Sequence, residues 1–199
     1  MRNNIWTNPD EYSDFKESMI VKTFNNYFIG LCQNDKYCVI NKDTNSFILP
    51  PKYEYIDCHI SSKVIYFKAI EHESNELSSV GSYKLFNSFG KEIKFNIENL
   101  KRIDSLEIFT NELILIFYIT NDEEGHINYI NFKGDLLLDE NLINSFDEIS
   151  NPQYDLDDGT VYVLGYNYPE NLNESAESTR IEKITKMFFN SKKKKFVME

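Results

Sequence analysis

Acidic side chains recur in the polar segments of this 199-residue chain. Clustered carboxylates attract a basic protein surface, and they also supply the hard oxygen ligands that divalent cations prefer. The candidate binding residues are Glu71, Glu73, Asp122, Glu123, Glu124, Asp155, Asp157, Asp158 and, as the large apolar side chain of the longest polar segment, Leu172. If their loops gather on one rim, these residues form a docking surface. Otherwise they only keep the surface polar.

Two histidines lie beside these carboxylates. His72 sits between Glu71 and Glu73, and His126 follows Glu124. A neighbouring carboxylate raises the pKa of an imidazole, so either ring is a candidate general acid or base. Catalysis also needs a nucleophile and an orienting partner, and the chain contains no G-x-S-x-G, Walker A, H-E-x-x-H or G-x-G-x-x-G motif. We therefore predict a non-enzymatic role. The alternative is a metal-dependent hydrolase or nuclease that uses loop carboxylates and one of these histidines.

No cofactor or metal is predicted from the remaining candidate ligands. Cys32, Cys38, Cys58 and His59 lack the paired C-x-x-C spacing of a zinc site, so we expect reduced thiols that fill β positions. The acidic run 155–159 resembles the opening of a calcium loop, but it lacks the later bidentate Glu of an EF-hand. This pattern favours an ordinary acidic turn.

The charge balance favours a basic protein partner. Lys and Arg number 21 against 32 Asp and Glu, a net charge of -11, which opposes direct binding to nucleic acid or to anionic lipid. We interpret the basic run 192–195 as a solvated turn. Residues of hydrophobic type make up 41% of the chain and aromatic residues 15%, enough material for a buried core. The oligomeric state stays open.

The chain is also predicted to stay off membranes. Its longest apolar stretch, 113–119, is far shorter than the roughly 20 residues that cross a bilayer as a helix. The first residues, Met1 to Glu11, lack the apolar core of a secretory signal. We expect a cytoplasmic protein.

Internal repetition is the most informative pattern. Four short β-prone runs each end in an Asn immediately before a turn, at Asn41, Asn87, Asn131 and Asn190. In two of these turns a glycine follows, Gly90 and Gly134, which supplies the positive φ of a tight hairpin. The spacing is about 45 residues, except that a polar insertion at 169–180 lengthens the last interval.

The β-prone runs around each turn Asn predict three to four antiparallel strands per repeat. The leading runs are 27–31, 64–67, 113–119 and 161–164, and the runs after each turn are 47–50, 92–96, 135–139 and 195–199. A weaker fourth run follows the first three hairpins, at 51–57, 100–104 and 142–147. The predicted repeats are therefore about 26–60, 63–105, 112–150 and 160–199, within one domain that spans 1–199.

These repeats predict an all-β fold, either a small propeller-like ring or an open array. The last repeat has no fourth run, and residues 11–25 are the candidate closing strand that would complete a ring and remove exposed sheet edges. The alternative is a single twisted sheet with a short helix over 171–186.

The first repeat resembles a known family. Tyr37-Cys-Val-Ile-Asn41, followed by Pro50-Pro-Lys-Tyr53, is similar to the WG-repeat unit, which runs aromatic-Gly-hydrophobic-Ile-Asn/Asp, turn, hydrophobics, Pro-Pro-x-Tyr. In place of the Trp-Gly pair that gives the family its name, this chain has Tyr37-Cys38, Tyr83-Lys84 and Asn128-Tyr129. The resemblance implies a bacterial β-repeat module that acts by interaction and has no catalytic residues. We expect an acidic protein-binding module, such as an immunity protein, an adaptor, or an inhibitor of a nucleic-acid-processing protein.

Overall fold

The structure is a computed structural model that describes residues 20–32, 35–61, 64–72, 81–110, 113–154, 160–168, 181, 183–190, 192–193 and 195–198. These residues form fifteen β-strands and one helix of four residues, so the predicted all-β class is confirmed. No helix within them has both the length and the apolar character to span a membrane.

The strands form four separate antiparallel sheets. The first sheet has the order β1 (Ile20–Phe24), β2 (Tyr27–Leu31), β3 (Tyr37–Asn41) and β4 (Ser46–Tyr53), and the second β5 (Tyr55–Ser61), β6 (Val64–Glu71) and β7 (Ser82–Asn87). The third contains β8 (Leu100–Ile108), β9 (Ile114–Thr120) and β10 (Gly125–Ile130). In the fourth, β13 (Val161–Asn167), β14 (Lys183–Asn190) and β15 (Lys195–Met198) are joined by β11 (Glu148–Ile149) and β12 (Gln153–Tyr154), which both pair with β13.

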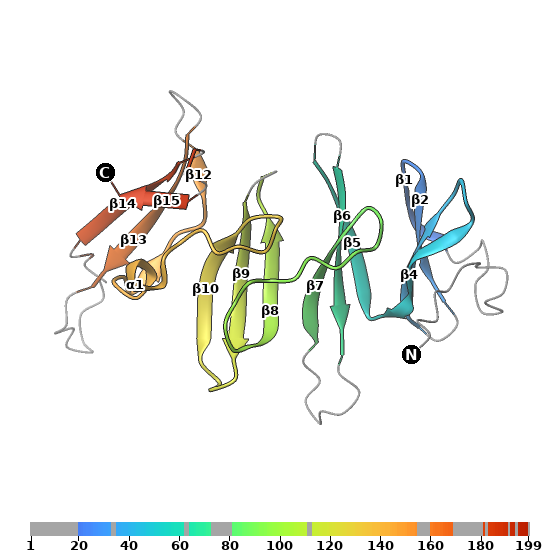
Figure 1. Ribbon diagram of the computed structural model, residues 1–199, viewed down its shortest axis with the longest axis horizontal. Coiled ribbons are helices and arrows are strands. Elements are labelled where there is room, and N and C mark those ends of the chain that lie inside the picture. The colour runs from blue at the N-terminus through green and yellow to red at the C-terminus, as the bar shows by residue number, and fades with distance from the viewer. Residues whose placement is uncertain are drawn as a thin grey trace.

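The sheets follow one another in a row, with β1 in the sheet at one end and β15 in the sheet at the other (Figure 1). Within the described residues no sheet closes, and β1 pairs with β2 rather than with a C-terminal strand. Of the two predicted arrangements, a ring or an open array, no closed ring is present in this part of the chain. Residues 11–19 of the candidate closing strand lie outside the described residues. The alternative helix over 171–186 is wrong from residue 183 onward, because β14 begins there.

Two predicted strands are replaced by single bridges. Residues 92–96 and 135–139 each make one isolated bridge to the preceding strand, Phe86 to Glu92 and Ile130 to Leu136. The ladder stops there because the chain turns toward a neighbouring sheet: the amide of Asn96 donates to the carbonyl of Gly134 rather than to β7.

Strands that begin within the weak fourth runs pair with strands that come later in the sequence, not with the hairpin before them. Strands β5 and β8 pair with the leading strand that follows each of them, β6 and β9, and so does the short β11 with β13. The predicted run 142–147 is not a strand, because α1 (Glu140–Ile143) begins just before it. The Asp139 carboxylate accepts the amide of Asn141 and so caps this helix.

Most of the hydrophobic core lies in three layers between successive sheets, and a fourth, small cluster contains Cys32, Cys38 and Ile40 of the first sheet and its edge. The first layer joins the first two sheets, with Ile29, Val39, Leu49, Tyr53, Ile56, Phe67 and Phe86 among its buried side chains. The second layer includes Leu85, Ile103, Ile114, Ile116 and Ile130, and the third includes Leu113, Tyr129, Val163, Met187 and Phe196. Because successive strand residues point to opposite faces, each inner sheet contributes side chains to two layers.

The four turn asparagines all stabilise the turn that follows them through their side-chain oxygen. The side-chain oxygen of each accepts two backbone amides of the turn that follows it, which satisfies donors that the hairpin leaves open. The amides are those of Asp43 and Thr44 for Asn41, Phe89 and Lys91 for Asn87, Lys133 and Asp135 for Asn131, and Lys192 and Lys193 for Asn190.

The middle two turns touch the sheet before them. Gly90 and Gly134 both have positive φ, and a Cβ at either position would lie within 2.2 Å of a backbone oxygen, that of Ile48 and of Lys94 respectively. Each turn therefore lies against the segment that follows the previous turn. The turns accordingly share one edge of the row, which we call the Asn-turn rim. The β9–β10 turn lies at the other end of β10 and so on the opposite rim.

Candidate functional site

The acidic segment 122–124 forms the turn of the β9–β10 hairpin. The strands pair in regular register, with Gly125 opposite Ile119 and His126 opposite Tyr118. The turn closes through the amide of Thr120, which donates to the carbonyl of Glu124 at 3.1 Å, and through the amide of Glu123, which donates to the carbonyl of Thr120 at 3.0 Å. The adjacent candidate residues are thus held on one rigid hairpin.

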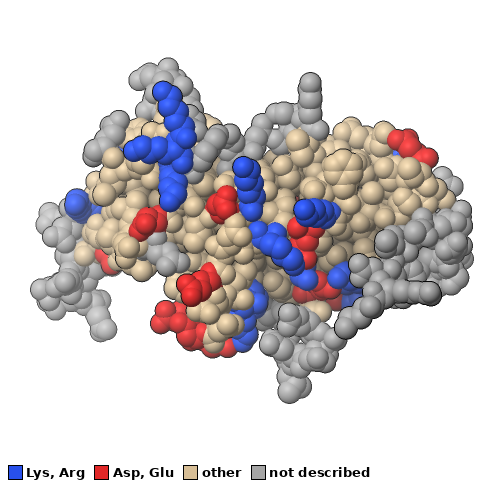
Figure 2. Space-filling model, in the orientation of Figure 1, with Lys and Arg blue, Asp and Glu red and all other residues tan. Residues whose placement is uncertain are grey.

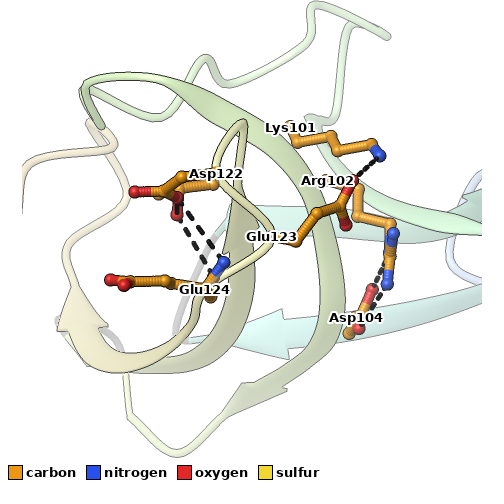
Figure 3. A network of polar contacts seen from close by, with 7 residues as sticks. Lys101, Arg102, Asp104, Asp122, Glu123 and Glu124 are labelled. Atoms are coloured by element: carbon orange, nitrogen blue, oxygen red, sulfur yellow. Dashed lines mark hydrogen bonds and ion pairs between the residues drawn. The ribbon is translucent and has the colours of Figure 1, made fainter.

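Asp122 is held as a carboxylate by its own turn. The Thr120 hydroxyl donates to its Oδ1 at 2.5 Å. The Glu124 amide lies 3.5 Å from the same oxygen (Figure 3). The hydrogen bond from Thr120 is the main cause that lowers the pKa of Asp122. A carboxyl with a lowered pKa stays ionised at neutral pH, so Asp122 offers a fixed negative charge rather than a general acid.

Glu123 points the other way. Its carboxylate accepts a hydrogen bond of 2.5 Å from the ammonium group of Lys101 on β8, and this hydrogen bond lowers the pKa of Glu123 (Figure 3). Beside Lys101 on the same strand, Arg102 donates to Asp104 through Nε at 2.6 Å. The charge of Glu123 is therefore paired with a lysine of the same chain. Asp122 and Glu124 are the two carboxylates of this turn that face away from β8.

His126 lines one side of the site, and its contacts do not arrange it as the base of a catalytic triad. Its ring stacks on Tyr118 with 5.2 Å between centroids. The hydroxyl of Thr120 and the carboxylate of Glu124 both approach the same nitrogen, Nε2, at 3.3 and 4.0 Å. A catalytic triad needs the two ring nitrogens to serve different partners, and the Thr120 proton already goes to Asp122. This geometry does not activate the hydroxyl.

The hairpin borders a shallow depression of about 200 Å³. Three carboxylate residues line it, Glu98, Asp122 and Glu124, together with Asn99, Tyr118, Thr120, His126, Ile127, Ile143 and Asn144. Asn99 is brought there because its carbonyl accepts the amide of Asn121, and Ile143 comes from α1. Three negative groups around an aromatic floor suit a guanidinium or ammonium group.

Sequence reasoning missed most of this lining. Tyr118 could have been found from the hairpin register, because a three-residue turn at 121–123 places it opposite His126. Glu98, Ile143 and Asn144 come from segments outside the hairpin, and no local pattern indicates their approach.

Glu71 belongs to a different sheet and a different network. It ends β6, where Lys52 donates to its Oε1 at 2.6 Å and Lys84 pairs with its Oε2. Burial raises the pKa of this carboxyl, but the two lysines outweigh burial and hold it below its ordinary value. His72, the next residue, is exposed. The structure therefore separates Glu71 from the Asp122–Glu124 turn.

The other candidates add no second site to the described chain. Glu73, Asp155, Asp157, Asp158 and Leu172 lie outside the described residues. Across the described ranges, no group of three His, Cys, Asp or Glu residues is placed to hold a metal ion.

Cys38 lies in β3 and Cys58 in β5, as expected, whereas Cys32 directly follows the end of β2. Cys32 and Cys38 are buried and Cys58 is half-buried, and all three are free thiols. The Sγ atoms of Cys32 and Cys38 lie 3.8 Å apart, and burial raises the pKa of the Cys38 thiol. A raised pKa keeps this thiol protonated and unreactive.

Several lysines lie on the other rim. Lys91, Lys94 and Lys133 line a groove of about 400 Å³ on the Asn-turn rim together with Glu92, which pairs with Lys94, and Lys192 and Lys193 are exposed in the last turn. Figure 2 shows Lys and Arg side chains over the upper and central surface and a group of acidic side chains at the lower edge. The overall charge of -11 is therefore not spread evenly.

Comparison with known proteins identifies no relative: no family model, curated protein or solved structure matches this chain.

Proposed function

We propose that this chain is a non-catalytic binding module that docks on a protein with a basic surface. The depression beside Asp122 and Glu124 receives a Lys or Arg side chain of that partner. The observation behind this proposal is that the turn's own hydrogen bonds fix the Asp122 carboxylate at the edge of a depression that is lined by two further carboxylate residues. A preformed negative site loses little conformational entropy on binding, and it speeds association with a positive partner.

The scaffold is inferred to be an open array of four stacked units, in the manner of WG repeats. Supporting this are the four turn asparagines, which make equivalent hydrogen bonds, and the two glycine turns that each contact the sheet before them. In such an array each unit contacts only its neighbours, which leaves both rims and both end sheets for interaction. An inhibitor or immunity protein would act in this way by covering a basic functional surface of its partner.

Capture of a partner from the native cell extract tests the proposal. The tagged chain, the double variant D122N/E124Q and the control double variant E92Q/E107Q are compared at low and high salt, followed by mass spectrometry. Both variants remove two negative charges, but Glu92 and Glu107 lie outside the depression. We expect the wild type and the control to recover the same basic protein, with the yield falling as salt rises.

The affinity of the recovered partner is then measured directly. D122N/E124Q should bind at least about tenfold more weakly than the control, a difference of about 1.4 kcal/mol. Equal affinity for the two double variants would contradict the proposed site. Recovery of an acidic protein, or a complex that salt does not weaken, would contradict the proposed partner class.

A further inference from the structure

Strand β10 is an edge strand of the third sheet, and its outward backbone groups can be read from the ladder with β9. The Thr120 amide donates to the Glu124 carbonyl, and positions bonded to the partner strand alternate with outward ones along an antiparallel ladder. The N–H and C=O groups of Gly125, Ile127 and Tyr129 therefore point away from β9.

The chain itself covers only the second half of this edge. The carbonyl of Tyr129 accepts the amide of Leu137 at 2.7 Å, and the amide of Tyr129 donates to the side-chain oxygen of Asn128 at 2.7 Å. Among the described residues, none bonds to the outward groups in the first half, residues 125–127, which we call the open edge of β10.

In the second sheet the next strand approaches the corresponding edge. Ser82 lies five places before its turn asparagine, as His126 does, and its hydroxyl accepts the amide of Ile103 on β8 at 3.1 Å. After β10 the chain instead forms α1, on the side of β10 away from β9 (Figure 1). Ile127 and Ile143 both line the acidic depression, so this depression reaches the open edge.

The open edge has acidic surroundings. Proteins commonly protect an edge strand with Lys or Pro, whereas the open edge consists of Gly, His and Ile. Glu98, Asp122 and Glu124 line the depression beside it, with no Lys or Arg among the lining residues. The ammonium of Lys101 on β8 is bound by Glu123. A segment that pairs with this edge therefore meets negative charge, which selects a basic one.

We propose that the basic partner binds as an extended segment that adds an antiparallel strand to the open edge of β10, with a Lys or Arg opposite His126. The direction follows from the other half of the edge, where Leu136 already makes an antiparallel bridge to Ile130. This inference rests on the proposed function, because it states the form in which the basic partner occupies the depression.

The register connects the added strand to the depression. Side chains directly opposite one another in a ladder lie on the same face, so a basic side chain opposite His126 lies on the face of Tyr118 and His126, which both line the depression. Backbone hydrogen bonds along the edge then supply affinity for an extended segment, and the carboxylates supply the preference for a basic side chain.

The same register decides which backbone amides of the partner matter. The residues before and after the basic residue lie opposite Ile127 and Gly125, and their N–H groups donate to the outward carbonyls of these two residues. The N–H group of the basic residue itself points away from β10.

NMR spectroscopy of the isotope-labelled full chain tests the inference, with the peptide acetyl-Thr-Val-Arg-Val-Thr-amide as the probe. When about nine-tenths of the chain holds peptide, hydrogen exchange at the Gly125 and Ile127 amides should slow about tenfold, because only the free tenth exchanges. The amide of His126, which points toward β9, is the internal control and should exchange at an unchanged rate.

Two methylated probes separate strand addition from charge binding. A methyl group on the amide nitrogen of the valine after arginine removes the donor to Gly125, and it should weaken binding about tenfold. A methyl group on the amide nitrogen of arginine faces away from β10 and should leave the affinity within about twofold of the unmethylated peptide.

The outcomes distinguish this inference from the proposed function. Equal affinity of the two methylated peptides, or unchanged exchange at Gly125 and Ile127 with the arginine peptide bound, would overturn strand addition and leave the acidic site intact. Equal binding of a citrulline peptide, or no binding at about 10 mM arginine peptide, would contradict both. Protection of these two amides as the concentration of the chain alone rises would assign the edge to a second copy and also overturn the proposal.

Discussion

Gly134 lies directly against the carbonyl group of Lys94. A Cβ at position 134 would stand 1.9 Å from the Lys94 oxygen, and the glycine also has a φ of 86°. The neighbouring hydrogen bond, from the amide of Asn96 to the carbonyl of Gly134 at 2.8 Å, fixes the same contact. The turn after β10 is therefore fastened through backbone to the segment that follows β7, in addition to the core layer between these two sheets.

Gly134→Ala should break this fastening. The new methyl group meets backbone, and the positive φ is unfavourable for alanine, so we expect a loss of about 2 kcal/mol or more of unfolding free energy. Urea unfolding followed by circular dichroism measures it. Lys133→Ala, in the same turn but exposed, should stay within about 0.5 kcal/mol of wild type. A G134A protein as stable as K133A would contradict the contact.

The turn asparagines should stabilise the fold as hydrogen-bond acceptors and not through the size or polarity of the side chain. Asn87→Ala removes an oxygen that accepts the amides of Phe89 and Lys91, both at 3.0 Å, and should cost about 1 kcal/mol. Asn87→Asp keeps that oxygen and should cost less than half as much. Thermal unfolding of the two variants checks this, and equal losses would show that the acceptor is not what the position needs.

Asn128 is fully buried and joins β10 to the segment after the third turn. Its amide nitrogen donates to the carbonyl of Leu138, and its oxygen accepts the amide of Leu138, both at 3.2 Å. Asn128→Leu leaves two buried backbone groups unpaired, so we expect a loss of about 2 to 4 kcal/mol. Hydrogen exchange at the Leu138 amide should accelerate in the same variant. Unchanged exchange there would refute the assigned role.

Stability should depend on pH through Glu71. Its folded pKa is lowered below the ordinary value of 4.5, so its stabilisation is present above pH 4.5 and is lost as pH falls through the folded pKa. Glu71→Gln should therefore lower stability at neutral pH and flatten the acid limb of the stability curve. Urea midpoints measured from about pH 7 to about pH 3 test this. An E71Q protein that loses stability on acidification as steeply as wild type would contradict the shift.

The local chemistry of the sequence predicted the strands well. Strand β2 coincides with the predicted run 27–31, and all four turn asparagines end a strand or directly follow one. These features depend on β-branched and aromatic composition and on turn residues, which act over a few neighbours.

What the sequence did not predict depends on contacts between sheets. Residues 92–96 have strand composition, yet the chain leaves β7 after one bridge, and the amide of Asn96 donates to the carbonyl of Gly134 in the turn that follows β10. The helix α1, capped by Asp139, includes the first two residues of the predicted run 142–147. In the candidate site, the acidic turn was found from sequence, but Glu98 is brought to it by the hydrogen bond between its neighbour Asn99 and Asn121, and Asn144 lies there at the end of α1.

The most direct measurement of the proposed binding site is an NMR titration of the isotope-labelled chain with a short arginine-containing peptide, using the peptide with citrulline in place of arginine as control. Amide shifts should change first and most at Asp122, Glu124, His126 and Glu98, and the citrulline peptide should leave them unchanged. Shifts distributed over acidic residues throughout the chain, or equal shifts with citrulline, would contradict a dedicated site for a basic side chain.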